Sequence, residues 1–260
     1  MAEVIVLDTP DDAGRFVAAH IAREVRANPE FTLGVATGST PLPVYQALHA
    51  ESEAGTDFTR LTAFALDEYV GLPVEHPESY RSVVDREVTV PLGLDPARVH
   101  VPDGSVEGIQ TAGARYEAAL EANGGVDLQL LGIGRTGHLG FNEPGSSFGS
   151  LTRVKTLTER TRIDNARFFD SLDQVPIHCV TQGLGTILRA RHLVLLAFGE
   201  GKAEALAAAV EGPVSASMPG SAIQLHARVT VVVDRAAASE LKFRDYYQWA
   251  QDHKPDWQGI

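Results

Sequence analysis

The sequence predicts an α/β protein, a single three-layer α/β/α domain over residues 1–260 with a mostly parallel, Rossmann-like central sheet. Short apolar runs with the length of buried strands alternate with helical patterns along the whole chain. Several of these runs end in glycine, hydroxyl or acidic residues just before a helix begins. The sequence has no internal repeat, low-complexity tract or linker that would divide it.

Composition excludes several classes of protein. With 260 residues, 44% of them hydrophobic, the chain can form one large core. The single cysteine, Cys179, excludes a disulfide framework and a cysteine-based zinc site. A net charge of −12 without a basic stripe argues against nucleic acid as a partner. No apolar run approaches the ~20 residues that span a membrane, and no signal-peptide pattern is present, so we expect a cytoplasmic protein.

The first half of the chain predicts four strands and four helices. The strands are expected at 4–7, 31–36, 61–66 and 126–133. The helices are expected at 10–28, 41–50, 79–87 and 106–123. Thr9-Pro10 is a helix start, and the pairs Asn28-Pro29 and Gly124-Gly125 end helices.

The second half continues this alternation. After a segment at 152–157, helices are expected at 164–170, 181–189, 202–210 and 236–250, with strands at 192–198 and 229–233. The polar tail 251–260, which contains Trp257, has no assignment.

The most informative stretch is Leu130 to Ser147, where a buried strand runs into glycines at positions 132, 134, 137 and 140. His138 and Glu143 lie inside this turn. Ligands of open α/β sheets bind beyond the carboxyl ends of the strands, so a titratable pair there indicates a site. The alternative is a tight loop with a hydrogen-bonded histidine and a solvated glutamate.

The second strand runs into Thr37-Gly38-Ser39-Thr40, followed by Pro41. Thr40 suits an N-cap and Pro41 the first helical position, and a helix start with free N–H groups and hydroxyls binds anions such as phosphate. The segment lacks the signatures of a P-loop and of a dinucleotide-binding turn. The alternative is a capped helix without a ligand.

Two further strand exits carry charge. The third strand ends at Asp67-Glu68, of which at most one should point at a shared site because strand side chains alternate. Lys202 begins a helix after the strand at 192–198, where the helix dipole prefers an anion. Each of these side chains could also be solvated. Because parallel strands share one edge, the four exits together predict a phosphorylated substrate and acid–base chemistry, with no metal or nucleotide.

These segments resemble the glucosamine-6-phosphate deaminase family across nearly the whole chain. The matching stretches are Thr37–Pro41, Leu66–Pro73, His76–Tyr80, Gly132–Gly134, Gly137–Pro144 and Ser221–His226. The wider superfamily, which includes 6-phosphogluconolactonases, shares the first stretch and part of the glycine-rich one. It is not expected to have the runs Asp-Glu-Tyr-Val-Gly-Leu and Phe-Asn-Glu-Pro.

The resemblance implies conversion of glucosamine 6-phosphate to fructose 6-phosphate and ammonia in N-acetylglucosamine catabolism, without a metal or organic cofactor. It implies that Asp67 is the general base, that His138 opens the sugar ring and that Glu143 is the acid coupled to that histidine. The implied phosphate ligands are the loop Thr37, Gly38, Ser39 and Thr40 together with Arg167 and Lys202.

Two features qualify the resemblance. The family often has Asp or Asn two residues before the histidine; here Thr136 stands there, preceded by Arg135, which predicts a less basic imidazole and slower ring opening. Some members are hexamers activated by N-acetylglucosamine 6-phosphate, and their effector contacts match Ser146, Arg153 and Lys155. Whether that pocket forms, and whether the chain is a homo-oligomer, stays open at this point.

Two other functions are compatible with parts of the pattern. A 6-phosphogluconolactonase-like hydrolase would use the hydroxyl loop and His138 without needing Asp67 or Glu143. A non-catalytic sugar-phosphate sensor would need a DNA-binding segment, which this acidic sequence does not predict.

Overall fold

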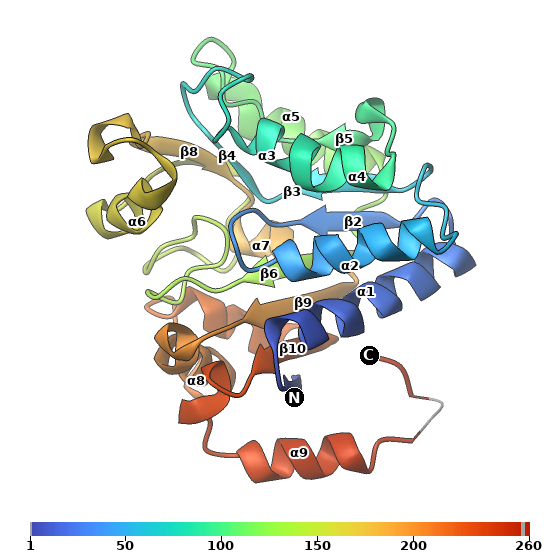
Figure 1. The fold of residues 1–260 in the computed structure, drawn as a ribbon. Coiled ribbons are helices and arrows are strands. Elements are labelled where there is room, and N and C mark those ends of the chain that lie inside the picture. The colour runs from blue at the N-terminus through green and yellow to red at the C-terminus, as the bar shows by residue number, and fades with distance from the viewer. Residues whose placement is uncertain (1, 256–257) are drawn as a thin grey trace.

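The computed structural model describes residues 2–255 and 258–260, so Trp257 lies outside the described residues. Its centre is a seven-stranded sheet in the order β1-β10-β9-β6-β2-β3-β5, with every pairing parallel (Figure 1). The strands are β1 Glu3–Leu7, β2 Thr32–Val35, β3 Thr62–Ala65, β5 Val99–His100, β6 Leu128–Gly132, β9 His192–Ala197 and β10 Val229–Asp234. The predicted α/β class with a mostly parallel central sheet is confirmed.

Helices cover both faces of this sheet (Figure 1). One face is packed by α1 Pro10–Ala27, α2 Leu42–Glu53, α3 Tyr80–Val84 and α4 Val90–Leu92. The other is packed by α5 Ile109–Ala122, α7 Leu184–Ile187, α8 Ala203–Glu211 and α9 Arg244–Asp252. Figure 1 shows α6 Glu159–Asn165 beside the second sheet described below.

Alternation along the strands builds the two hydrophobic cores. In β6, Leu130 belongs to the α1–α2 core and Leu131 to the α5–α8 core. In β10, Val232 belongs to the α1–α2 core and Val231 to the α5–α8 core. All four side chains are fully buried, which explains why these strands are continuous apolar runs in the sequence.

A second, three-stranded antiparallel sheet was not predicted. It has the order β4-β8-β7, with β4 Asp67–Tyr69, β8 His178–Thr181 and β7 Arg153–Thr156. β4 follows β3 after one residue, Leu66, so the chain leaves the main sheet and enters the small one where Asp67 pairs with Thr181. Asp67 is therefore fixed by pairing to another strand and does not lie in a free loop.

The small sheet explains one wrong prediction. A helix was expected at 181–189, but β8 occupies the start of that segment and α7 is only Leu184–Ile187. The glycines at 183 and 185 lie so close to the backbone of Gly149 and Ser150 that side chains there would overlap it.

Three other helix boundaries also differ. The closing helix expected at 236–250 is a 3-10 segment, Ala237–Glu240, followed by α9, because the Glu211 carboxylate accepts the backbone N–H groups of Lys242 and Phe243 at the start of α9. The helix expected at 164–170 begins earlier as α6, since Thr158 caps it by accepting from the N–H of Thr161 at 3.1 Å. The predicted cap Thr40 is displaced by one residue, and Pro41 is the N-cap of α2.

The order of the strands decides where a ligand can bind. After β2 the chain moves outward through β3 to β5; from β6 it moves to the other side through β9 to β10. The direction reverses between the neighbours β2 and β6, which is the place where open α/β sheets form a crevice. The four predicted strand exits belong to the adjacent strands β9, β6, β2 and β3, so the expectation of one shared edge is confirmed.

Candidate active site at the carboxyl edge of the sheet

A cleft of about 670 Å³ lies at this edge. Its lining includes most of the predicted site residues, namely Thr37, Gly38, Ser39, Thr40, Asp67, His138, Arg167 and Lys202. Thr136 and Glu143 do not line it; they stand behind His138 and bind its ring. Segments separated by more than a hundred residues are thus brought to one concave surface.

Three side chains form a hydrogen-bonded unit around the imidazole. The Thr136 hydroxyl donates to Glu143 Oε2 at 3.0 Å and lies 3.1 Å from Nδ1 of His138. Since the hydroxyl has one proton and gives it to the carboxylate, it accepts a hydrogen bond from Nδ1. Nδ1 is also 3.3 Å from Glu143 Oε1. Both contacts favour the tautomer protonated at Nδ1, which leaves Nε2 as the proton acceptor of the neutral ring.

Glu143 is held as a carboxylate. It is 5% exposed, and burial by itself would raise its pKa. Hydrogen bonding and charge from His138, together with the hydroxyls of Thr161 and Thr136, outweigh burial and lower the pKa of Glu143 to about 2. Thr158 adds a donor at 3.3 Å. The two threonines from the α6 start were not predicted, and nothing in their local sequence indicates them.

Two glycines are required by close approach to the catalytic candidates. A β-carbon on Gly134 would overlap the imidazole of His138. Gly140 has a φ of +54°, and a β-carbon there would lie 2.9 Å from Thr181 Oγ1 and 3.2 Å from Asp67 Oδ2. The glycine-rich pattern is therefore explained by side chains that lie directly against the turn.

Asp67 and Glu68 point to different surroundings, as strand alternation predicts. Asp67 lines the cleft and is 5% exposed; burial first and the nearby Glu68 second raise its pKa to about 8. Glu68 instead accepts the backbone N–H groups of Tyr69, Tyr80 and Arg81 at 2.7 to 2.9 Å, and so fixes the start of α3. A carboxyl group with a pKa near neutrality in a cleft is typical of an acid–base residue.

Cations and hydroxyls gather at the other end of the cleft. Gly38, with a φ of +87°, turns the loop before α2, and its neighbours at 37, 39 and 40 carry hydroxyl groups. Lys202 donates to the carbonyl oxygen of Ile133 at 2.7 Å. Burial, and then the charges of Arg135 and Arg167, lower the pKa of Lys202, and the charge of Asp164, which also lines the cleft, opposes them. No carboxylate of the described residues lies within ion-pair distance of these three cations, so they are available to a bound anion.

Arg135 also lines the cleft, and the sequence does not predict it as a site residue. Its position between Gly134 and Gly137 is the available signal, because Thr136 and His138 of the same turn both belong to the site.

The predicted effector residues lie elsewhere. Ser146 is buried, and its hydroxyl has no hydrogen-bond partner among the described residues. Arg153 and Lys155 are alternate residues of the edge strand β7, so they share one of its faces. Arg153 donates to the carbonyl of Leu151 at 3.3 Å.

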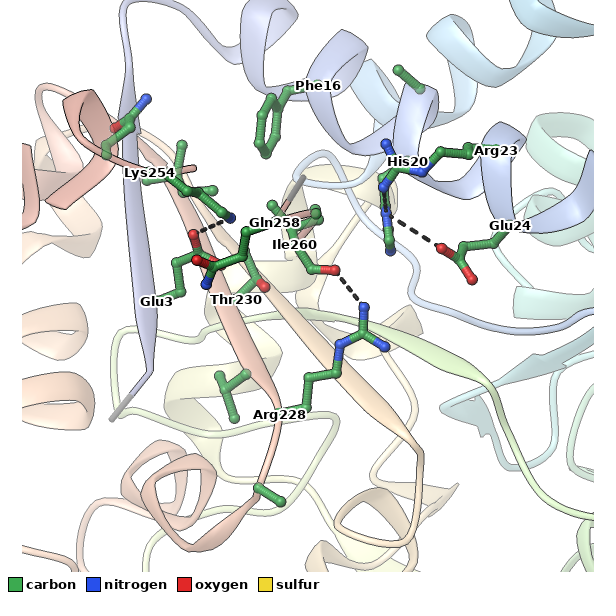
Figure 2. A pocket seen from close by; sticks show the side chains of 16 residues that line it. Glu3, Phe16, His20, Arg23, Glu24, Arg228, Thr230, Lys254, Gln258 and Ile260 are labelled. Carbon is green, nitrogen blue, oxygen red and sulfur yellow. Dashed lines mark hydrogen bonds and ion pairs between the residues drawn. The ribbon is translucent and has the colours of Figure 1, made fainter. Parts of the chain in front are cut away.

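A second cavity, of about 970 Å³, lies at the opposite edge of the sheet (Figure 2). It is lined by Glu3 and Thr230 near the starts of β1 and β10, by α1 and by the chain end. Figure 2 shows Lys254 paired with Glu3, and Arg228 with the carbonyl oxygen of Ile260. This cavity is larger, but Lys254 in its lining is paired with Glu3, and it does not collect the residues of the motifs.

Neither a metal site nor a membrane-spanning helix is found within the described residues. Across residues 2–255 and 258–260, no group of three or more histidine, cysteine, aspartate or glutamate side chains is arranged to hold a metal ion. No helix within the same residues is long and apolar enough to cross a membrane.

Fold and cleft together are typical of an α/β enzyme: one cleft at the carboxyl edge of the sheet is lined by Asp67, His138 and several cations. The family model described as glucosamine-6-phosphate isomerases/6-phosphogluconolactonase matches residues 8–232. The chain belongs to this family.

Relatives and solved structures agree with this assignment. The chain is 60% identical to the glucosamine-6-phosphate deaminase of Streptomyces coelicolor, over 99% of this chain and all of that protein. It is 54% identical to that of Bifidobacterium longum over the full length of both. A structure of a monomeric glucosamine-6-phosphate deaminase is similar at a TM-score of 0.89 and 40% identity, covering 92% of this chain and 100% of the other. The 6-phosphogluconolactonase of Trypanosoma cruzi shares the fold at a TM-score of 0.74 and 20% identity, covering 93% and 97%.

Proposed function

We propose that this chain is a glucosamine-6-phosphate deaminase, which converts D-glucosamine 6-phosphate and water to D-fructose 6-phosphate and ammonia in amino-sugar catabolism. The observation that carries the proposal is the meeting, in one cleft, of a buried carboxyl group, a Glu143-bound imidazole and unpaired cations beside a hydroxyl loop. Full-length identity of 54% and 60% to proteins of that name supports the choice of substrate.

His138 would open the sugar ring. Ring opening takes a proton from the C1 hydroxyl and delivers one to the ring oxygen. With Nδ1 protonated toward Thr136 and Glu143, Nε2 can accept the first proton and return it to the ring oxygen. Glu143, kept ionised, stabilises the imidazolium that exists between the two transfers.

Asp67 would then act on the open chain. Its carboxylate removes the proton from C2 and returns it to C1, while a proton of the C2 ammonium passes to the C1 oxygen. These two transfers produce a hydroxyl group at C1 and a protonated imine at C2. Addition of water to this imine, and loss of its nitrogen, gives the ketone of fructose 6-phosphate and ammonia. The raised pKa of Asp67 makes the carboxyl a stronger base once it is ionised, and a substrate ammonium group at C2 would favour that ionised form.

The phosphate would bind at the opposite end of the cleft, among the Thr37–Thr40 loop, Arg167 and Lys202. Binding energy from a group that does not react would hold C1 and C2 against the two acid–base residues. The reaction as written needs no metal ion and no organic cofactor.

The lactonase alternative is less well supported. Hydrolysis of a lactone would not need a carbon base, whereas this chain buries Asp67 in the cleft and builds four hydrogen-bonding or ionic contacts around Glu143. The sensor alternative would leave the same two groups without a purpose. The predicted cytoplasmic location stays a prediction.

The test is to incubate the purified protein with glucosamine 6-phosphate and to measure ammonia and fructose 6-phosphate together. We expect the wild type to release both products in equal amounts. In Asp67→Asn the rate of release should be reduced at least about 1000-fold, since general-base groups contribute roughly 10²–10⁴ to the rate. Hydrolysis of 6-phosphogluconolactone without ammonia release would favour the lactonase. Binding of the phosphosugar without any turnover would favour the sensor.

We also propose that Ser146, Arg153 and Lys155 bind the phosphate of an activating N-acetylglucosamine 6-phosphate. The unpartnered hydroxyl and the two cations on one face of β7 support this. N-acetylglucosamine 6-phosphate should lower the KM of the wild type and leave that of Lys155→Gln unchanged. An unchanged KM of the wild type would contradict this proposal. Light scattering with and without effector distinguishes a homo-oligomer from a monomer.

A further inference from the structure

Arg135 follows the end of β6 and lines the cleft, but neither the motif nor the proposed chemistry assigns it a role. Its side chain is exposed at the rim. A long cation in such a place is most often solvated, so its neighbours decide whether it belongs to the site.

The guanidinium lies against the turn that carries Lys202. A β-carbon on Gly201 would be 3.6 Å from Arg135 Nη2 and 4.0 Å from Nε. The same turn presents Lys202, whose amine is anchored to the carbonyl of Ile133, two residues before Arg135. The two cations therefore share one wall of the cleft.

The opposite wall is the hydroxyl loop. A β-carbon on Gly132 would be 3.8 Å from Cβ of Thr40, so the loop before α2 packs against the end of β6. Arg135 comes three residues after Gly132 in the sequence. Arg167, whose guanidinium carbon is 4.7 Å from the centre of the Phe168 ring, also lines the cleft.

Charge supports a ligand between these walls. In a chain with a net charge of −12, Arg135, Arg167 and Lys202 line one cleft, and none of these three has a carboxylate within ion-pair distance among the described residues. Arg86, which also lines the cleft, is paired with Glu87. Like charges at close range repel unless an anion lies between them. A phosphate monoester carries nearly two negative charges, and a guanidinium can bind two of its oxygens at once.

We propose that Arg135 is a further ligand of the substrate's 6-phosphate, closing the outer side of a pocket formed by the hydroxyl loop, Arg167 and Lys202. The inference rests on the proposed function for the identity of the substrate, but not for the chemistry of the ligand, which is a phosphate ester. Arg135 contributes to binding and positioning and takes no part in proton transfer.

The experiment compares Arg135→Gln, Arg135→Lys and the control Arg244→Gln. Arg244, the exposed first residue of α9, lies outside the lining of the cleft, and its substitution removes the same charge from the chain. Calorimetry measures the Kd of glucosamine 6-phosphate in an Asp67→Asn background, which prevents turnover, and the Kd of inorganic phosphate. Turnover of the single variants gives kcat and KM.

We expect Arg135→Gln to raise the Kd of both ligands about tenfold, as is typical for loss of one charged hydrogen bond, and to raise KM with kcat within about threefold. Arg135→Lys should be intermediate, and Arg244→Gln unchanged. An unchanged Kd in Arg135→Gln, an equal change in Arg244→Gln, or a fall in kcat without a change in Kd would overturn the inference. If the wild type releases no ammonia but the Kd of inorganic phosphate still rises in Arg135→Gln, the deaminase proposal fails and the role of Arg135 stands.

Discussion

The two ends of the parallel strands carry two cavities whose charged side chains have different partners. At the amino edge, Lys254 is paired with Glu3 and the Arg23 guanidinium lies 2.7 Å from Nδ1 of His20. At the carboxyl edge, Arg135, Arg167 and Lys202 have no acidic partner within the part of the chain that the structure describes. The larger volume belongs to the cavity that contains the Lys254–Glu3 pair.

The titratable groups at the two edges also differ in their pKa values. Burial, followed by the charges of Arg23, Arg228 and Lys254, lowers the pKa of His20 to about 4, so this histidine is neutral and inert near pH 7. Asp67, with a pKa of about 8, can gain or lose a proton near pH 7. Volume alone therefore does not identify a site; unpaired charge and a poised proton do.

The largest expected effect is on stability. In Asp67→Asn the buried ionisable group is removed. Since the folded protein holds the Asp67 proton up to about pH 8, against an ordinary pKa of 3.8, wild-type stability should fall as pH rises through that window. The slope is about 1.4 kcal/mol per pH unit for one group. Between pH 5 and pH 8 the melting temperature of the wild type should therefore fall relative to that of Asp67→Asn. A constant difference between the two melting temperatures would contradict this.

The next effect tests the packing at the glycine-rich turn. Gly134→Ala introduces a methyl group where the His138 ring lies, so the imidazole must move. We expect kcat to fall about 100-fold, because a displacement of about 1 Å in a catalytic group has effects of that size. Gly149→Ala, at an exposed glycine where a β-carbon would meet no atom closer than 4.0 Å, controls for the loss of a glycine itself. Full activity of Gly134→Ala would mean that the ring position is not critical.

At the amino edge the pH dependence should have the opposite sign. His20 binds a proton less readily when folded, so stability should fall as pH falls from 6.5 toward 4. In His20→Leu this loss should disappear, a difference of roughly 1–2 kcal/mol at pH 5. Activity near pH 7 should be unaffected. Identical acid sensitivity of the two proteins in thermal unfolding would exclude His20 as its source.

A smaller effect is expected at the hydroxyl bridge. Thr136→Val removes the oxygen that joins His138 to Glu143, while Glu143 remains 3.3 Å from the ring. We predict roughly tenfold lower kcat, about the value of one hydrogen bond, and recovery in Thr136→Ser. The pH–rate profile of Thr136→Asp tests the predicted effect of the missing charge: an unchanged rate and profile would refute it.

The smallest effect sharpens the contrast between the two edges. Lys254→Ala breaks the pair with Glu3. Partly exposed ion pairs contribute roughly 0–1 kcal/mol to the free energy of unfolding. Steady-state kinetics should stay within about twofold of the wild type. A large loss of kcat would show that the amino-edge cavity is coupled to the cleft, and the comparison would then have to be revised.

The sequence by itself determined the parallel sheet and several residues of the cleft. Strand and helix periods are local properties, and the strands β2, β3, β6 and β9 all lie within a predicted run. Because parallel strands end at one edge, Asp67, His138 and Lys202 could be expected at one site without knowledge of the fold's details.

Tertiary structure alone decided the small antiparallel sheet, the support of Glu143 by Thr158 and Thr161, and the place of Arg135 in the cleft. β4, β8 and β7 are three or four residues long, and β4 pairs with β8 across more than a hundred positions, so no local period indicates them. Charge pairing is equally non-local: the sequence contains arginines and lysines, but only folding determines which of them meet a carboxylate and which are left for a substrate.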